Sequence, residues 1–269
     1  MVGATKWIYI PQPDKEIIDA LAQEYHFHEI IVNDLIEVNA QSKIDINSNN
    51  FFLTLTFTKY LPEEQRYVLN ELDVIIGDDY IITTTSNESI NLKVFFESFA
   101  EEVKHINGSY KSSPYYILYR IIDVFYDKTI KSLNASTKAL LDIQDNIAYR
   151  KVEREVVEDL ITEDLNKIFI KHNFLSQEDV IDDLVAHVKL FHEKHLNVYY
   201  NDLKVKLSKI VSTINVLSEK TDSLLSAYNT FVGIKNNDNV TRLTFVNAIF
   251  LPLMLLAGIG GMSEWSMIT

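Results

Sequence analysis

The sequence predicts an α+β domain, followed by a long helical bundle and stalk that leads into a transmembrane helix. Three observations support this fold class. Runs of β-branched and aromatic residues occur in the first 110 residues, glycine and proline are absent from Tyr115 to Val232, and no charged residue occurs from Leu243 to Ser263. The first pattern is typical of strands, the second of long helices, and the third of a bilayer span.

In the N-terminal part, four runs have the composition of strands and two segments have the apolar spacing of helices. The expected strands are Trp7–Ile10, Phe51–Phe57, Leu72–Ile76 and Tyr80–Thr85, and the expected helices are Asp14–Glu24 and Asn91–Val103. Gly77-Asp78-Asp79, between the last two strands, indicates a hairpin turn. We therefore expect residues 1–110 to form one α/β domain.

Beyond Pro114, the sequence predicts helices with few interruptions. Residues 111–196 should form a helical region, within which Ser176 and Asp179 resemble a capping box and indicate the start of a new helix. Residues 197–242 should form a stalk helix. If this helix continues to Gly260, it is about 95 Å long and extends beyond any globular body of this size.

The uncharged segment 243–263 is the candidate transmembrane helix. As a helix it spans about 31 Å, close to the thickness of a bilayer core, whereas the alternative of a buried core helix rarely runs so long without a charge. Lys235 and Arg242 precede it, which favours a cytoplasmic location for the preceding domain. Residues 264–269 should then begin an external loop, in a protein of the cell (inner) membrane.

Charge and composition exclude several classes of function. The chain has 25 basic and 38 acidic residues, and its first 110 residues contain seven basic and 18 acidic side chains, which argues against nucleic-acid binding. No cysteine is present, so disulfides, cysteine zinc sites and thiol nucleophiles are excluded. No catalytic constellation occurs, and we expect neither an enzyme nor an organic cofactor.

Two further motifs are weak candidates for ligand binding. His187, His192 and His195 lie on a predicted helix, but their spacing is not that of a His-Glu-x-x-His zinc site, and a solvated helix face is the favoured interpretation. The glycines Gly258, Gly260 and Gly261 follow an apolar helix and no strand, which argues against a nucleotide loop.

The apolar segment also carries a family resemblance. The sequence AIFLPLMLLAGIGGM followed by SEWSM resembles the first transmembrane helix and the Gly-Met-Asn signature of the CorA magnesium/cobalt transporter family. Here the signature reads Gly261-Met262-Ser263, with serine in place of asparagine. Upstream, HFHEIIVNDLIEVNAQSKID, Glu71–Thr85 and Pro114–Lys131 resemble further segments of the family, so the resemblance covers nearly the whole chain.

The resemblance implies a homopentameric funnel with a cytoplasmic α/β domain, a stalk helix that becomes the first pore-lining span, and a second span with a basic tail. The sequence stops at Thr269, so we expect the second span to be missing from this chain. The implied function is uptake of a divalent cation, Mg²⁺ above all and also Co²⁺ or Ni²⁺, gated by cytoplasmic Mg²⁺. The implied partners are identical chains, the lipid bilayer and divalent cations.

The predicted pore helix carries a stripe of residues at spacings of three and four. The stripe comprises Asn237, Val240, Thr244, Asn247, Leu251, Met254 and Gly258. By resemblance it faces the fivefold axis, with polar rings at Asn237 and Asn247, an apolar constriction at Val240 and Leu243, and the signature Gly261-Met262-Ser263 at the external end. Neutral oxygens suit a hydrated Mg²⁺ ion. Simple helix packing is the alternative.

A regulatory metal site is also implied by the resemblance. Asp202 falls on the family's position for an aspartate that binds Mg²⁺ between neighbouring subunits, and the position of its partner falls near Leu61, close to Glu63 and Glu64. An ordinary exposed aspartate is the alternative for Asp202. For the whole protein, the alternatives to a Mg²⁺ channel are a membrane-anchored helical scaffold and a transporter of zinc or another divalent cation.

Overall fold

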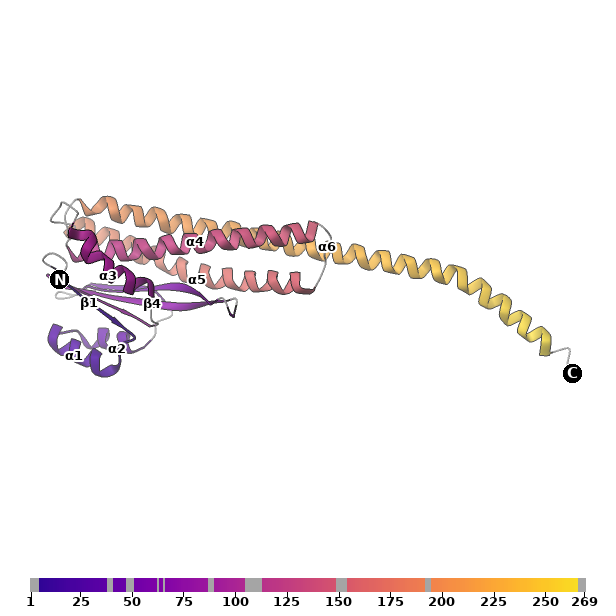
Figure 1. The fold of residues 1–269 in the computed structure, drawn as a ribbon, viewed down its shortest axis with the longest axis horizontal. Coiled ribbons are helices and arrows are strands. Elements are labelled where there is room, and N and C mark those ends of the chain that lie inside the picture. Colours follow the sequence, from indigo (N-terminus) through magenta and orange to yellow (C-terminus); the bar gives the residue numbers. More distant parts are fainter. Residues whose placement is uncertain are drawn as a thin grey trace.

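The fold is taken from a computed structural model that describes residues 5–37, 41–46, 51–61, 63–64, 66–86, 90–104, 113–148, 154–191 and 195–265. Five strands and six helices follow one another in these residues (Figure 1). In chain order they are β1 (Lys6–Pro11), α1 (Lys15–Tyr25), α2 (Glu29–Ile36), β2 (Lys43–Ile46), β3 (Phe51–Leu61), β4 (Arg66–Ile76), β5 (Tyr80–Thr85), α3 (Ile90–Lys104), α4 (Pro114–Ala148), α5 (Arg154–Phe191) and α6 (Leu196–Trp265). The predicted α+β class with a long C-terminal helix is confirmed.

The strands form one mixed sheet in the order β1-β5-β4-β3-β2. β1 pairs with β5 in parallel, and the other neighbours are antiparallel. β3 and β4 pair along their whole length, from Phe51 opposite Ile76 to Leu61 opposite Arg66. The predicted turn between β4 and β5 is present, and a Cβ on Gly77 would lie 2.2 Å from the Tyr80 ring, so a larger residue there would require this ring to move.

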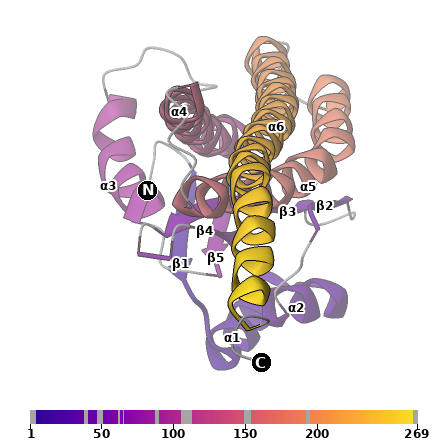
Figure 2. The same cartoon turned by 90° about the vertical axis from the view of Figure 1, so that its right-hand side faces the viewer.

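Both faces of the sheet are covered, because side chains alternate along each strand. On one face, Ile18 of α1 and Ile31 of α2 pack on Phe52, Ile75 and Ile82. The other face carries the larger core, shared with α3, α4, α5 and α6. The domain therefore has helices on both sides of a central sheet (Figures 1 and 2).

Three long helices form a bundle on this second face. α4 and α5 lie on the sheet, and α6 lies over both of them on the side away from the sheet (Figure 2). Lys206 of α6 forms ion pairs with Asp123 and Asp127 of α4, at 2.8 Å in the case of Asp127. α6 is 70 residues long, or about 105 Å, and its residues 233–260 are exposed beyond the end of the bundle.

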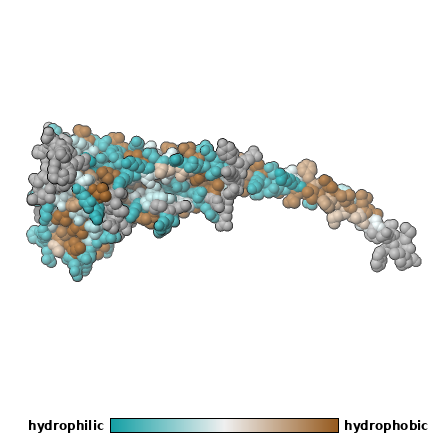
Figure 3. Space-filling model, in the orientation of Figure 1, coloured by the Kyte–Doolittle hydropathy of each residue, from teal (hydrophilic) through white to brown (hydrophobic). Residues whose placement is uncertain are grey.

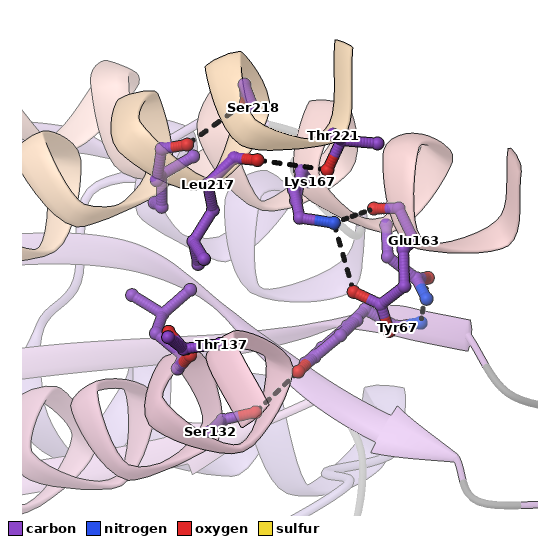
Figure 4. Close-up of polar contacts among 11 residues, drawn as sticks. Tyr67, Ser132, Thr137, Glu163, Lys167, Leu217, Ser218 and Thr221 are labelled. Carbon is purple, nitrogen blue, oxygen red and sulfur yellow. Dashed lines mark hydrogen bonds and ion pairs between the residues drawn. The ribbon is translucent and has the colours of Figure 1, made fainter. Parts of the chain in front are cut away.

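Buried polar contacts fix α5 against the sheet and α4. The Gln177 side chain donates to the carbonyl of Thr56 at 2.6 Å and accepts from the Tyr126 hydroxyl at 2.9 Å. Closer to the start of α5, the Lys167 ammonium group, only 1% exposed, donates to the Glu163 carboxylate at 3.0 Å (Figure 4). The Gln177 contacts therefore join α5 to β3 and α4, whereas the Lys167–Glu163 pair satisfies a buried charge within α5 itself.

The structure corrects one predicted helix boundary. α5 continues through Ser176, so the expected helix start at this residue is wrong. The Ser176 hydroxyl donates to the carbonyl of Asn173, and the Asn173 amide donates to the carbonyl of Phe169, both at 2.8 Å. These polar side chains bond back to the preceding turn of a continuous helix instead of capping a new one. α2 and β2 are additional elements that the sequence analysis did not assign.

Candidate functional site

α6 has an apolar outer half that could cross a membrane. The helix contains an 18-residue window of mean hydropathy 2.0, none of it buried by the rest of the chain. Leu243, Phe250 and Leu255 of this half are 58% to 66% exposed. Figure 3 shows the corresponding apolar region on the protruding part of the helix. Such a surface is unstable in water, and lipid or other copies of the helix must cover it.

The stripe from Asn237 to Gly258 lies on this continuous helix, so its spacing of three and four places its members on one face. Val240, Leu251 and Met254 of the stripe are 59%, 65% and 68% exposed. Leu243 lies beside the stripe and is 63% exposed. The whole predicted stripe is therefore exposed in this structure. The other faces of this part of α6 are exposed as well.

The polar members of the stripe differ in how their groups are satisfied. The Thr244 hydroxyl donates to the carbonyl of Val240, one turn earlier, at 2.9 Å. Among the described residues, the exposed amide of Asn247 forms no hydrogen bond with its own chain. An amide in hydrocarbon is costly without a partner, so Asn247 requires water or a neighbouring chain around it.

The signature residues lie at the far end of α6. The helix continues to Trp265, so Gly261, Met262 and Ser263 are helical, and Glu264 lies in the helix and not in a loop. The side chains of these residues lie outside the described part of the structure. At Gly258, a Cβ would meet nothing within 4 Å in the isolated chain.

Asp202 is an exposed residue near the start of α6. It lies close enough to Tyr119 of α4 to affect the ionisation of its hydroxyl. Burial is the main cause that raises the pKa of Tyr119 to about 12, and the negative charges of Asp123 and Asp202 add to it. Lys206 follows one turn later; burial lowers the pKa of its ammonium group, but the hydrogen bonds to Asp123 and Asp127 outweigh this effect and raise it. Asp202 is thus one acidic group in a charged region at the base of α6.

Glu63 and Glu64 are exposed in the turn between β3 and β4, and Glu64 pairs with Arg66 at 2.5 Å. The structure does not bring them to Asp202. The adjacent Tyr60 lines a hollow together with Asp142 of α4, whereas Asp202 lies beside Tyr119 of the same helix. The 23 positions between these α4 residues correspond to about 35 Å.

Sequence reasoning missed a pair of buried carboxylates on β4. Glu71 and Asp73 are each 3% exposed and line a cavity of about 170 Å³ at the end of the sheet. Asp73 accepts hydrogen bonds from the Thr54 hydroxyl at 2.8 Å and the Thr84 hydroxyl at 3.2 Å, and burial raises its pKa to about 6. Two acids at alternate positions of a strand rich in apolar residues were the available signal.

The described residues give no support for a metal site at the candidate histidines. The Nε2 atom of His187 and the Tyr115 hydroxyl form a hydrogen bond of 3.2 Å, and burial lowers the pKa of His187. His195 is exposed, and His192 lies outside the described residues. Within the described ranges, no group of three or more His, Cys, Asp or Glu side chains is arranged to hold a metal ion.

The fold and the sequence both match known proteins. The sequence profile of the family described as "CorA-like Mg2+ transporter protein" matches residues 3–263, nearly the whole chain. This chain belongs to the CorA-like Mg²⁺ transporter family. Its members are membrane transporters and not enzymes, which agrees with the family resemblance of the apolar segment.

Individual members of the family are distant in sequence. The cobalt/magnesium transport protein CorA of Thermotoga maritima is 20% identical over 249 residues, covering 92% of this chain and 70% of that protein. The complete structure of the CorA magnesium transporter from Methanocaldococcus jannaschii superposes with a TM-score of 0.82 at 17% identity, over 96% of this chain and 80% of the other.

A third relative shares the fold of the N-terminal part and the bundle. The cytoplasmic domain of ZntB from Vibrio parahaemolyticus has a TM-score of 0.67 at 15% identity, over 87% of this chain and 88% of that chain. At such identities the structural likeness establishes the fold, and the assignment to a family of divalent cation transporters rests on the profile.

Proposed function

We propose that this chain is a subunit of a homopentameric channel that conducts Mg²⁺ across the cell membrane, with its α/β domain and bundle in the cytoplasm. Co²⁺ and Ni²⁺ are candidate further substrates. The observation that carries the proposal is the α6 stripe, in which Asn247 places an amide, with no hydrogen bond among the described residues, within the uncharged segment 243–263. The number of subunits follows the family resemblance.

The chemistry of the stripe suits a hydrated ion. Mg²⁺ dehydrates reluctantly, so a ring of amide oxygens that accept hydrogen bonds from its water shell favours passage without stripping the ion. Asn237 and Asn247 supply such rings at two levels. Val240, between them, supplies an apolar ring that closes the path by excluding water when the helices approach.

Asp202 is the candidate regulatory ligand at the cytoplasmic end. A divalent ion held between neighbouring chains offsets the repulsion of their acidic surfaces, and its loss allows the chains to separate. If the closed state binds the ion more tightly than the open state, rising cytoplasmic Mg²⁺ closes the channel. Glu63 and Glu64 lie too far along the bundle axis to complete this site, so Asp202 requires other ligands.

Asn247→Leu tests the ion path. We expect at least a tenfold fall in Mg²⁺ uptake, because loss of about one hydrogen bond in the path raises the barrier by about 1.4 kcal/mol. The measurement is the initial rate of entry of Mg²⁺ into liposomes that contain the full-length protein and an enclosed fluorescent indicator. Phe245→Leu is the matched control, since Phe245 lies two positions away on the opposite side of α6 and is 68% exposed.

The control should retain uptake, and both variants should retain the oligomeric mass of the unmodified protein. Unaltered uptake in Asn247→Leu would make Asn247 a packing residue. Absence of uptake by the unmodified protein, in liposomes where it has assembled, would favour the helical scaffold instead.

A further inference from the structure

α5 carries an exposed apolar ridge that no other described residue of its own chain covers. The ridge consists of Ile161, Leu165 and Ile168, which are 49%, 62% and 58% exposed. Their spacing of four and three places them on one face of the helix. The remaining faces of α5 pack on α6 and on the sheet, so the ridge forms the outer flank of the bundle.

An apolar hollow occurs on the opposite flank, between α4 and α6. It has a volume of about 350 Å³, with apolar walls from Ile147, Leu224, Ala227 and Phe231 and a rim that includes Gln144 and Lys220. Figure 2 shows α4 and α5 on opposite sides of α6, so the α4–α6 hollow and the α5 ridge face away from each other within one chain.

The ridge and the hollow lie at the same level along the bundle. The ion pair between Asp182 and Lys204, at 2.8 Å, sets the register of the antiparallel helices α5 and α6. Leu165 precedes Asp182 by 17 positions, so it is level with the residue 17 positions after Lys204. That residue, Thr221, lies next to Lys220 at the rim of the hollow.

We propose that the α5 ridge of one chain fills the α4–α6 hollow of the next chain in a closed ring of identical chains. Every α6 crosses the same membrane in this proposal, so the ring axis runs along α6. Rotation about this axis keeps each residue at the same height along it. Two different surfaces that meet in this way form a head-to-tail contact, which closes into a ring and does not stop at a dimer. The inference rests on the proposed homo-oligomeric channel.

Burial and charge both support this occupant. The ridge and the hollow walls lose water-exposed apolar surface on contact, which stabilises the pair. Asp164 flanks the ridge and Lys220 lies at the rim of the hollow at a similar level, so opposite charges meet at the edge of the contact.

Disulfide cross-linking tests the contact directly, because the natural chain has no cysteine. In the full chain in detergent, Leu165→Cys combined with Gln144→Cys should give a ladder of covalent multimers on a denaturing gel after oxidation. A disulfide within one chain would leave the mass of a single chain. The matched control combines Gln144→Cys with Leu190→Cys, which is 75% exposed on the same helix but about 38 Å away from the level of Leu165.

A second variant removes the contact without touching the core. Leu165→Asp should abolish the oligomer in a mass measurement and leave the circular dichroism spectrum unchanged, whereas Leu190→Asp should leave the oligomer intact. An oligomer that forms without cross-links, or that survives Leu165→Asp, would overturn the contact and leave the proposed channel standing. A monomeric unmodified chain would overturn the proposed assembly, and this contact with it.

Discussion

Replacing Asp73 with asparagine is expected to stabilise the α/β domain at neutral pH. The Asp73 carboxylate, on the central strand β4, is 3% exposed beside Glu71 and accepts hydrogen bonds from Thr54 and Thr84. Lys43 is the nearby positive charge. An asparagine at this position has the same shape as aspartate and removes the buried charge. Its amide oxygen can accept a hydrogen bond from one threonine hydroxyl, and its amide nitrogen can donate one to the other.

The magnitude follows from the pKa of Asp73, which burial raises from 3.8 to about 6. One pKa unit corresponds to 1.36 kcal/mol, so the buried charge reduces the free energy of unfolding by about 3 kcal/mol at neutral pH. Because the pKa is raised in the folded state, the stabilising contribution of the protonated group is fully present below about pH 4. It is lost as the pH rises through 6.

Trp7 reports unfolding of this sheet, since its indole is buried and donates to the Thr83 hydroxyl at 3.0 Å. Trp265 is the other tryptophan, and Trp265→Phe removes its signal. Urea unfolding of the full chain in detergent at pH 4.5 and 7.5 should show Asp73→Asn gaining stability at the higher pH. Asp19→Asn, on the exposed side of α1, is the control. Lower stability of Asp73→Asn at pH 7.5 would refute the reasoning.

Two more variants probe the bundle and the proposed regulation. Tyr126→Phe leaves the buried Gln177 carbonyl without its donor and should reduce the free energy of unfolding by about 1–3 kcal/mol, measured by urea unfolding. Asp202→Ala should reduce the protection that Mg²⁺ gives α6 against proteolysis. It should also raise Mg²⁺ uptake at high internal Mg²⁺. Unchanged protection and uptake would make Asp202 an ordinary surface acid.

The strongest patterns in the sequence predicted the architecture correctly. β3 and β5 contain long runs of β-branched and aromatic residues, and their strand assignments are confirmed, with β3 extending to Leu61. The absence of glycine and proline from Tyr115 to Val232 predicted the long helices, since turns depend on these residues. Both signals are local, so the sequence alone carries them.

The errors occur where tertiary contacts decide. β2 has only four residues, Lys43–Ile46, and exists because it pairs with β3. Ser176 has the composition of a helix cap, but its neighbours Asn173 and Gln177 are buried in contacts that a continuous α5 positions. The distance between Asp202 and Glu63 along the bundle cannot be judged from the sequence, because it depends on how α6 and the β3–β4 hairpin lie on α4.

In the proposed assembly, we expect the part of α6 between the bundle and its apolar half to depend most on neighbouring chains for its structure. Over residues 196–232 the helix packs on α4 and α5, and from Leu243 its apolar surface suits lipid. The intervening segment, Gly233–Arg242, includes one glycine and three asparagines, which are poor helix formers, and all ten residues are exposed. A solitary helix of this composition is marginal in water, so we expect this segment to gain its stability from neighbouring chains in the proposed assembly.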